Sequence, residues 1–253
     1  MTTMDLTRRV IVALDFDTAG EASAVVERLG DACQSYKIGL QLLTAAGPAL
    51  ATTLAEAGKD VFLDLKLFEI PTSVAGAVRA AGRLGATMVT VHATGGSRIL
   101  AAAVGAAAEF PRLRVVALTV VTSLTAADLA EVGVAASTEE QVTRLALLAR
   151  AAGCHGVVAA PHDAAPLRRL LGSDQLIVTP GVTLPAPDPA GTDHARPAHP
   201  VDAFRAGASH VVIGRALTRA ADPRAVLAAI AEELRISGDG TRSAGHGPDS
   251  PSR

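Results

Sequence analysis

The chain has 253 residues, of which 49% are apolar, 19% charged and 2% aromatic, and its formal net charge is −2. Because the basic residues are scattered and aromatic stacking platforms are scarce, this composition argues against a nucleic-acid-binding protein. The apolar run near the N-terminus is too short for a signal peptide, and no apolar stretch reaches the roughly 18 residues of a membrane span. We therefore expect a soluble, cytoplasmic protein with neither a membrane nor a nucleic-acid partner.

The two cysteines do not form a recognisable motif. Cys33 and Cys154 lie far apart in the sequence and match no metal-binding or redox spacing. We predict that both are buried free thiols, because an unpaired cysteine usually packs as a small apolar side chain.

Eight short apolar or β-branched runs alternate with longer amphipathic stretches along the chain. Each run is too short for a stable helix and is bounded by Gly, Asp, Pro or Ser, whereas the stretches between runs are rich in Ala and Leu. In chain order the runs span residues 10–14, 35–39, 61–65, 88–92, 115–120, 156–160, 176–180 and 210–214. Strands that alternate with helices in this way predict βαβ units and a parallel sheet.

The number of predicted strands favours a barrel. Eight strands spaced roughly 20 to 40 residues apart are typical of a single α/β domain with the (β/α)8, or TIM-barrel, architecture. A doubly wound open sheet is the alternative, but it usually has fewer strands, and no Gly-x-Gly-x-x-Gly follows the first strand. We predict one barrel domain over residues 1–235. The polar residues 236–253, which are rich in Gly, Ser and Pro, are predicted to form a disordered tail.

Charged and polar residues stand at the carboxyl ends of nearly all the predicted strands. Alternation along the third strand puts Asp64 and Lys66 on one face, while Leu63 and Leu65 face the surrounding helices. The other strand ends carry Asp15, Lys37, His92, Thr122 with Ser123, Pro180 within "TPG" (179–181), and Gly214 with Arg215. Barrel enzymes place their active sites at this end, and the loops after the last two strands commonly bind phosphate. This convergence favours an active site over the alternative, a structural ion pair at one strand end.

Over about residues 8 to 234 the chain resembles the orotidine 5′-phosphate decarboxylases. The central motif of that family is Asp-x-Lys-x-x-Asp-Ile-Pro-x-Thr, and this chain has "DLKLFEIPTS" at residues 64–73. Further matches are "VALDFD" (12–17), "YKIG" (36–39), "VHATGG" (91–96), "TVVTSL" (119–124), "VTPGV" (178–182) and "VVIGRALTRAADP" (211–223). Related barrels, keto-gulonate-phosphate decarboxylase and hexulose-phosphate synthase, lack the Ile-Pro continuation and the Thr-Ser pattern of the fifth strand.

The resemblance implies an enzyme of pyrimidine nucleotide biosynthesis that decarboxylates orotidine 5′-phosphate to UMP without a metal or an organic cofactor. In the family, lysines and carboxylates alternate around the reacting carbon, so Lys37, Asp64, Lys66 and Glu69 are the expected catalytic residues. Lys66 would stabilise the carbanion at C6 and protonate it as CO2 leaves. Glu69 stands at the second aspartate of the motif, which the family contributes across a dimer interface. A homodimer with shared sites is therefore expected.

The resemblance also implies a set of substrate contacts. The residues expected to bind the nucleotide are Asp15, Ser73, Thr122, Ser123, Pro180, Thr183, His194, Gly214 and Arg215. Asp15 and Ser73 would hold the ribose hydroxyls, and Thr122 and Ser123 would contact the edge of the pyrimidine. Gly214 and Arg215, with main-chain N–H groups around them, would hold the phosphate.

Four of these residues depart from the family pattern. Glu69 replaces aspartate and Ser73 replaces threonine in the central motif, whereas Thr183 stands where the family commonly has arginine. His194 takes the approximate place of a glutamine in the loop after the seventh strand. Because all four changes touch the substrate, two alternatives stay open. One is a divergent paralogue that decarboxylates a related nucleotide or nucleoside, and the other is a nucleotide-binding protein without turnover.

Overall fold

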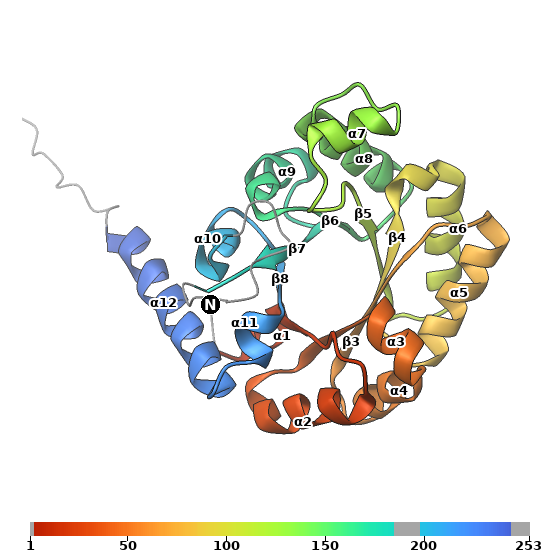
Figure 1. Ribbon diagram of the computed structural model, residues 1–253. Helices are drawn as coiled ribbons and strands as arrows, with labels where there is room; N and C mark the ends of the chain where they lie inside the picture. The colour runs from red at the N-terminus through yellow and green to blue at the C-terminus, as the bar shows by residue number, and fades with distance from the viewer. Residues whose placement is uncertain (1–2, 185–197, 244–253) are drawn as a thin grey trace, which may run out of the picture.

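Eight parallel strands close into a barrel in the structure, a computed structural model that describes residues 3–184 and 198–243 (Figure 1). Each strand pairs with the next one in the sequence, and β8 pairs with β1. The strands are β1 (Val10–Ala13), β2 (Ser35–Gly39), β3 (Asp60–Leu67), β4 (Met88–His92), β5 (Arg114–Leu118), β6 (Gly156–Val158), β7 (Leu176–Val182) and β8 (His210–Ile213). The prediction of a single (β/α)8 barrel is confirmed, and all eight strands begin and end within two residues of their predicted limits.

Helices follow each strand and form an outer ring around the barrel, and one further helix precedes β1 (Figure 1). They are α1 (Thr3–Arg9), α2 (Ala19–Leu29), α3 (Leu40–Ala46), α4 (Ala49–Glu56), α5 (Pro71–Arg83), α6 (Ser97–Ala107), α7 (Ala126–Glu131), α8 (Thr138–Ala151), α9 (Ala164–Leu171), α10 (Pro200–Arg205), α11 (Arg215–Thr218) and α12 (Pro223–Ser243). Local sequence explains where several begin. Ser137 and Glu140 form a capping box at the start of α8, and Pro71 occupies the first turn of α5, where its missing N–H costs nothing.

Side chains along each strand alternate between the barrel interior and the layer beneath the helices. The interior is filled by a small apolar cluster made of Ile11, Ala13, Phe62, Met88, Val116, Leu118, Val158, Val178 and Val212. The larger cluster packs strand residues such as Leu63 against helix residues such as Val74 and Val78. The barrel is therefore a packed core and no pore, so a ligand has to approach it from one of its two ends.

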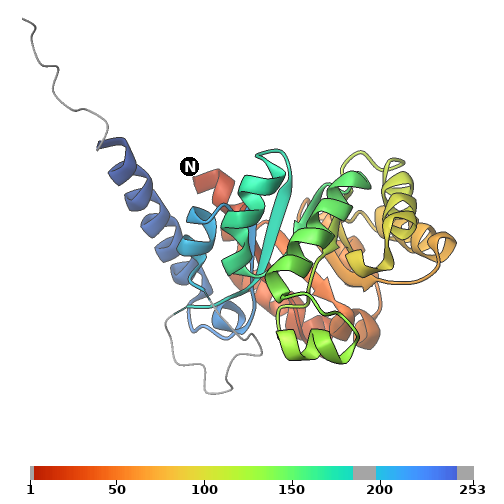
Figure 2. The ribbon, with the colours of Figure 1, turned by 90° about the horizontal axis from the view of Figure 1, so that it is seen from above.

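The last helix departs from the prediction for the end of the chain. α12 continues to Ser243, so residues 236–243 are helical and the prediction of a disordered tail is wrong for them. Leu227 and Ile230 anchor the buried part of this helix, and once a helix is nucleated each further residue adds a hydrogen bond. Figure 2 shows its C-terminal turns extending past the barrel wall. Residues 244–253 lie outside the described part of the chain.

The longest helix also bears on the membrane question. Although α12 has 21 residues, neither it nor any other helix in the described ranges is apolar enough over a sufficient length to cross a membrane.

The cysteine prediction is confirmed, since Cys33 and Cys154 are both free and buried. Burial raises the pKa of the Cys33 thiol to about 11 and that of the Cys154 thiol to about 12, so both stay protonated at neutral pH.

Candidate active site

Four charged side chains form a continuous series of ion pairs across three neighbouring strands at the carboxyl end of the barrel. The Nζ atom of Lys37, on β2, lies 2.9 Å from Oδ1 of Asp15 and 3.7 Å from Oδ2 of Asp64. The Nζ atom of Lys66 lies 2.9 Å from the same Oδ2 of Asp64. The series Asp15–Lys37–Asp64–Lys66, called the charged array below, alternates in sign, so each inner charge is offset by its neighbours.

The charged array runs from the protein interior out to solvent. The inner side chains, Lys37 and Asp64, are only 11% and 14% exposed, whereas Lys66 is 37% and Asp15 49% exposed. Gly39 makes room for the inner lysine, because a Cβ atom there would lie 3.0 Å from its Nζ. The two outer members of the array are therefore the ones that a ligand at the barrel mouth can reach.

Lys66 joins the charged array at a break in the regular sheet. It is the one non-glycine residue with a positive φ, 48°, in the described part of the chain. The register of β3 against β4 is irregular between Leu63 and Leu67. The predicted meeting of the Asp64 and Lys66 side chains is therefore observed, but the main chain at the lysine is left-handed and not the extended form that strand alternation assumes.

Thr90, on β4, supports the charged array from below. The side chain is fully buried; its hydroxyl accepts the main-chain N–H of Lys66 at 2.8 Å and donates to Oδ1 of Asp64 at 2.9 Å. The sequence did not single out this residue. A threonine inside the strand run "MVTVH" is ordinary for a β-strand, so nothing in the local pattern set it apart.

In the described part of the chain, neither Glu69 nor Ser73 forms a hydrogen bond or an ion pair with a member of the charged array. Glu69 is exposed, and its Oε1 accepts the main-chain N–H of Ile70 at 2.7 Å. Ser73 is exposed in the first turn of α5. Within the described residues, no ion pair joins Glu69 to a lysine. The predicted carboxylate is thus present at the rim of the site and not beside Lys66.

His92, at the end of β4, is a close neighbour of the charged array. Its Nδ1 lies 2.6 Å from the hydroxyl of Thr94, and its ring centroid is 5.8 Å from that of Phe68. Burial and the positive charge of Lys66 together lower the pKa of this histidine, so its imidazole is neutral at neutral pH.

The remaining predicted residues that the structure describes lie at the same end of the barrel. Thr122 and Ser123 follow β5, Pro180 and Thr183 lie in and just after β7, and Gly214 and Arg215 begin α11 after β8. The Thr183 hydroxyl donates to the carbonyl of Leu184 at 3.4 Å. His194 lies outside the described residues. All the described members of the predicted set therefore surround one mouth.

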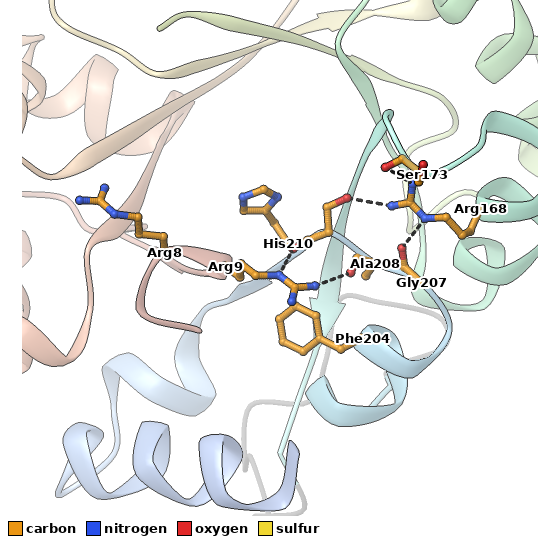
Figure 3. Close-up of a pocket in the computed structure, with 9 residues that line it drawn as sticks. Arg8, Arg9, Arg168, Ser173, Phe204, Gly207, Ala208 and His210 are labelled. Atoms are coloured by element: carbon orange, nitrogen blue, oxygen red, sulfur yellow. Dashed lines mark hydrogen bonds between the residues drawn. The ribbon is translucent and has the colours of Figure 1, made fainter. Parts of the chain in front are cut away.

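A cavity lies at the opposite, amino-terminal end of the barrel (Figure 3). It has a volume of about 590 Å³ and includes Arg9, Arg168 and Phe204 in its lining. The Arg9 guanidinium stacks 4.7 Å above the Phe204 ring and donates to main-chain carbonyls. Because Arg9 and Arg168 bond to the backbone and Arg8 pairs with Asp60, the cationic groups around this cavity already have partners, and we assign the cavity a structural role.

Comparison with known proteins gives a consistent result. The family model described as "Orotidine 5′-phosphate decarboxylase / HUMPS family" matches residues 8–230. A Halorhodospira halophila protein named orotidine 5′-phosphate decarboxylase is 48% identical over 234 residues, 91% of this chain and 97% of that protein. A Chromobacterium violaceum protein of the same name is 46% identical over 231 residues, 91% and 93% of the two chains. A crystal structure of orotidine 5′-phosphate decarboxylase from Lactobacillus acidophilus superimposes with a TM-score of 0.79 at 34% identity, covering 90% and 99%.

Proposed function

The chain belongs to the orotidine 5′-phosphate decarboxylase family, and we propose that it converts orotidine 5′-phosphate to UMP at the charged array. It is a carboxy-lyase, and the name of its relatives implies a place in pyrimidine nucleotide biosynthesis. The observation that carries the proposal is the alternation of two carboxylates and two ammonium groups at one barrel mouth. The relatives favour neither a paralogue with another substrate nor a binding protein without turnover.

Lys66 is the residue to which we assign the proton transfer. The bond between C6 and the carboxylate breaks so that its electron pair stays on C6 and CO2 leaves. The ammonium of Lys66 stabilises the negative charge that develops there and then donates one proton to C6, giving UMP. Asp64 holds this ammonium at 2.9 Å, and the partial exposure of Lys66 lets it regain a proton from water.

Asp15 and Lys37 complete the site on the ribose side. Asp15 is half-exposed at the mouth, so its carboxylate is free on one side to accept hydrogen bonds from ribose hydroxyls. Lys37 is nearly buried and contacts both Asp15 and Asp64, which suits a group that fixes the two carboxylates relative to each other. Fixed charges need no reorganisation during the reaction, and this is the main source of electrostatic catalysis.

The loops after β5, β7 and β8 supply the remaining contacts in this proposal. Main-chain N–H groups near Gly214 and the guanidinium of Arg215 bind the phosphate, since a guanidinium matches phosphate oxygens in charge and geometry. The residues assigned to the rest of the nucleotide are Thr122, Ser123, Pro180 and Thr183. Their common position at the mouth supports this assignment.

A homodimer is the second part of the proposal, because Glu69 and Ser73 lie at the rim of the site and not inside it. Three large apolar side chains near this rim, Leu40, Phe68 and Ile70, are 56%, 62% and 59% exposed. Exposed apolar side chains that gather around polar ones are typical of an interface between proteins. We infer that a second copy of the chain covers them and that Glu69 reaches the partner's charged array.

The activity itself is tested by following the ultraviolet absorbance of orotidine 5′-phosphate as UMP forms. The wild-type chain is expected to turn the substrate over, and the Lys66→Ala variant is expected to be inactive although folded. A folded wild-type chain that yields no UMP at saturating substrate would exclude the proposed reaction.

Sharing of the site between two subunits is tested by mixing two weak variants. Lys66→Ala and Glu69→Gln each damage both sites of a two-fold dimer. In a refolded equimolar mixture, half of the dimers contain one Lys66→Ala chain and one Glu69→Gln chain. In such a mixed dimer, one of the two sites has both wild-type residues. Activity should therefore recover to about a quarter of the wild-type value. No recovery in a mixture that light scattering shows to be dimeric would place Glu69 outside the partner's site.

A further inference from the structure

Thr90 is a fully buried polar side chain inside the barrel, directly beneath the charged array. Met88, two residues earlier on the same strand, belongs to the apolar cluster of the barrel interior, and alternation directs Thr90 to the same side. Burying a hydroxyl among apolar side chains is unfavourable unless it is hydrogen-bonded. Its two partners therefore indicate what this hydroxyl does.

The hydroxyl of Thr90 bridges the two charged residues of β3. A main-chain N–H can only donate, so the threonine oxygen accepts from Lys66, and its own O–H is left to donate to Oδ1 of Asp64. The other carboxylate oxygen, Oδ2, faces the ammonium groups of Lys66 and Lys37. Both oxygens of Asp64 consequently have fixed partners, and the carboxylate is held in one orientation.

Thr90 also supplies a hydrogen bond where the sheet cannot. The regular register of β3 against β4 is broken between Leu63 and Leu67, within which Lys66 adopts its left-handed conformation. At such a bulge a main-chain N–H loses its partner on the neighbouring strand. The threonine hydroxyl takes that place at 2.8 Å and so holds the lysine backbone at its unusual φ.

We propose that Thr90 is a positioning residue for the decarboxylation, an inference that rests on the role proposed above for Lys66. Because Thr90 is fully buried beneath the array, it does not reach the substrate itself. It acts by fixing the carboxylate of Asp64 and the main chain of Lys66 together, which sets the direction of the ammonium toward C6. Without the hydroxyl, the carboxylate rotates and the ammonium moves off the reacting carbon.

The experiment compares three variants by kcat, KM and thermal unfolding. A displacement of the ammonium on the order of 1 Å lowers kcat about a hundredfold in Thr90→Val, which keeps the shape and removes the hydroxyl. Thr90→Ser, which keeps the hydroxyl, stays within about fivefold of wild type, and KM changes by less than about threefold in both. Thr119→Val is the matched control, because Thr119 is also fully buried but donates to a main-chain oxygen, that of Val158, at 2.9 Å. It is expected to lose stability and keep kcat.

A second measurement follows the main-chain amide of Lys66 by hydrogen exchange in the substrate-free protein. Exchange of this amide is expected to speed up in Thr90→Val and to stay slow in Thr90→Ser and Thr119→Val. If Thr90→Val does not fold, Thr90→Cys carries the same test with a smaller fall in kcat, because a thiol is a weak hydrogen-bond donor.

The outcomes separate this inference from the proposed function. A wild-type kcat in folded Thr90→Val, an equal loss in Thr119→Val, or no rescue by serine overturns the positioning role while the function stands. If the wild-type chain itself forms no UMP, the proposed function fails, and the exchange of the Lys66 amide still reports whether Thr90 holds that residue.

Discussion

The two ends of the barrel both gather charged side chains, but they use them in different ways. At the carboxyl-terminal mouth the charged side chains form ion pairs with one another: Lys37 and Lys66 pair with Asp15 and Asp64. The pairs fix each side chain, while the outermost members of the series remain half-exposed at the surface. Such an arrangement can hold a charge that appears only during a reaction, because the compensating groups are already in place.

At the amino-terminal end, Arg8 and Arg112 pair with Asp60 at the surface, whereas Arg9 and Arg168 donate to the backbone. Arg168 donates to the carbonyls of Gly207, Gly172, Ser173 and Gln175 and to the hydroxyl of Ser209. Figure 3 shows its guanidinium joined by a dashed line to Gly207. The contacts to Gly207 and Gln175 are partly buried, and a carbonyl that is shielded from water needs a donor, which the arginine supplies. Charged residues near strand ends are therefore no sign of a site by themselves; the identity of their partners decides.

Removing the charge of Lys66 at the mouth is expected to have the largest effect on kcat. Lys66→Ala loses both the electrostatic stabilisation and the proton donor that we propose, so kcat should fall at least about a thousandfold. Lys66→Gly should be equally inactive and yet more stable than the alanine variant by about 1 kcal/mol, because glycine adopts a φ of 48° without strain. Steady-state kinetics and urea unfolding measure the two quantities. An alanine variant as stable as the glycine variant would argue against backbone strain at this residue.

Removing Arg168 at the opposite end is expected to lower stability and leave kcat unchanged. Arg168→Met keeps the apolar stem and strips several carbonyls of their donor, so the free energy of unfolding should fall by about 2 to 4 kcal/mol. The kcat of the folded fraction should not change. Arg112→Met is the control, since Arg112 is exposed and donates to Asp60 at 3.0 Å, a surface pair worth about 1 kcal/mol or less. A fall in kcat without loss of stability in Arg168→Met would contradict the division between the two ends.

At the rim of the mouth, Glu69 is expected to matter for turnover and not for the stability of the single chain. Glu69→Gln keeps the size and removes the charge, and it should lower kcat about ten- to a hundredfold if the carboxylate completes the partner's array. Glu69→Asp restores the residue of the family motif and should turn over at least as fast as wild type. Near-wild-type kcat in Glu69→Gln would mean that this carboxylate is not part of the catalytic array.

The smallest expected effect concerns two histidines, one at each end of the barrel. Nδ1 of His155 accepts the N–H of Val115 at 3.0 Å, and burial, together with the charge of Arg114, lowers its pKa. The pKa of His92, at the mouth, is lowered as well. In the unfolded chain a histidine has a pKa of about 6.5, so that state takes up protons first as the pH falls. The stability that these groups contribute is therefore complete above about pH 7 and is lost as the pH falls through 6.5 toward the lower native values.

Solvent screening of these partly exposed rings should keep the loss below about 1 kcal/mol per histidine. His155→Asn keeps an acceptor for the N–H of Val115 and does not titrate, so it should make the pH dependence of unfolding shallower without changing kcat. His92→Asn should act on the pH dependence in the same direction but should also alter kcat, because His92 neighbours Lys66. Urea unfolding at pH 5 to 8 measures the slopes. An unchanged slope in both variants would show that neither histidine is held neutral by the fold.

The sequence by itself determined the barrel and the composition of its mouth. Strand and helix periodicities are local, and eight alternations within one domain leave few architectures, so the strand limits were found within two residues. Polar residues at the strand ends then indicated the mouth, because parallel strands in a barrel all end on the same side. Asp15, Lys37, Asp64 and Lys66 could be grouped in this way before any distance was known.

Only the tertiary structure decided the features that depend on the register between strands. The left-handed Lys66 arises where β3 slips against β4, and a slip between two strands leaves no trace in the periodicity of either one. The hydroxyl of Thr90 reaches Lys66 and Asp64 from 24 and 26 residues away in the chain. Its partners were set by the pairing of β3 with β4 and not by local sequence, and the ion pair that joins Asp15 to Lys37 likewise depends on the pairing of β1 with β2.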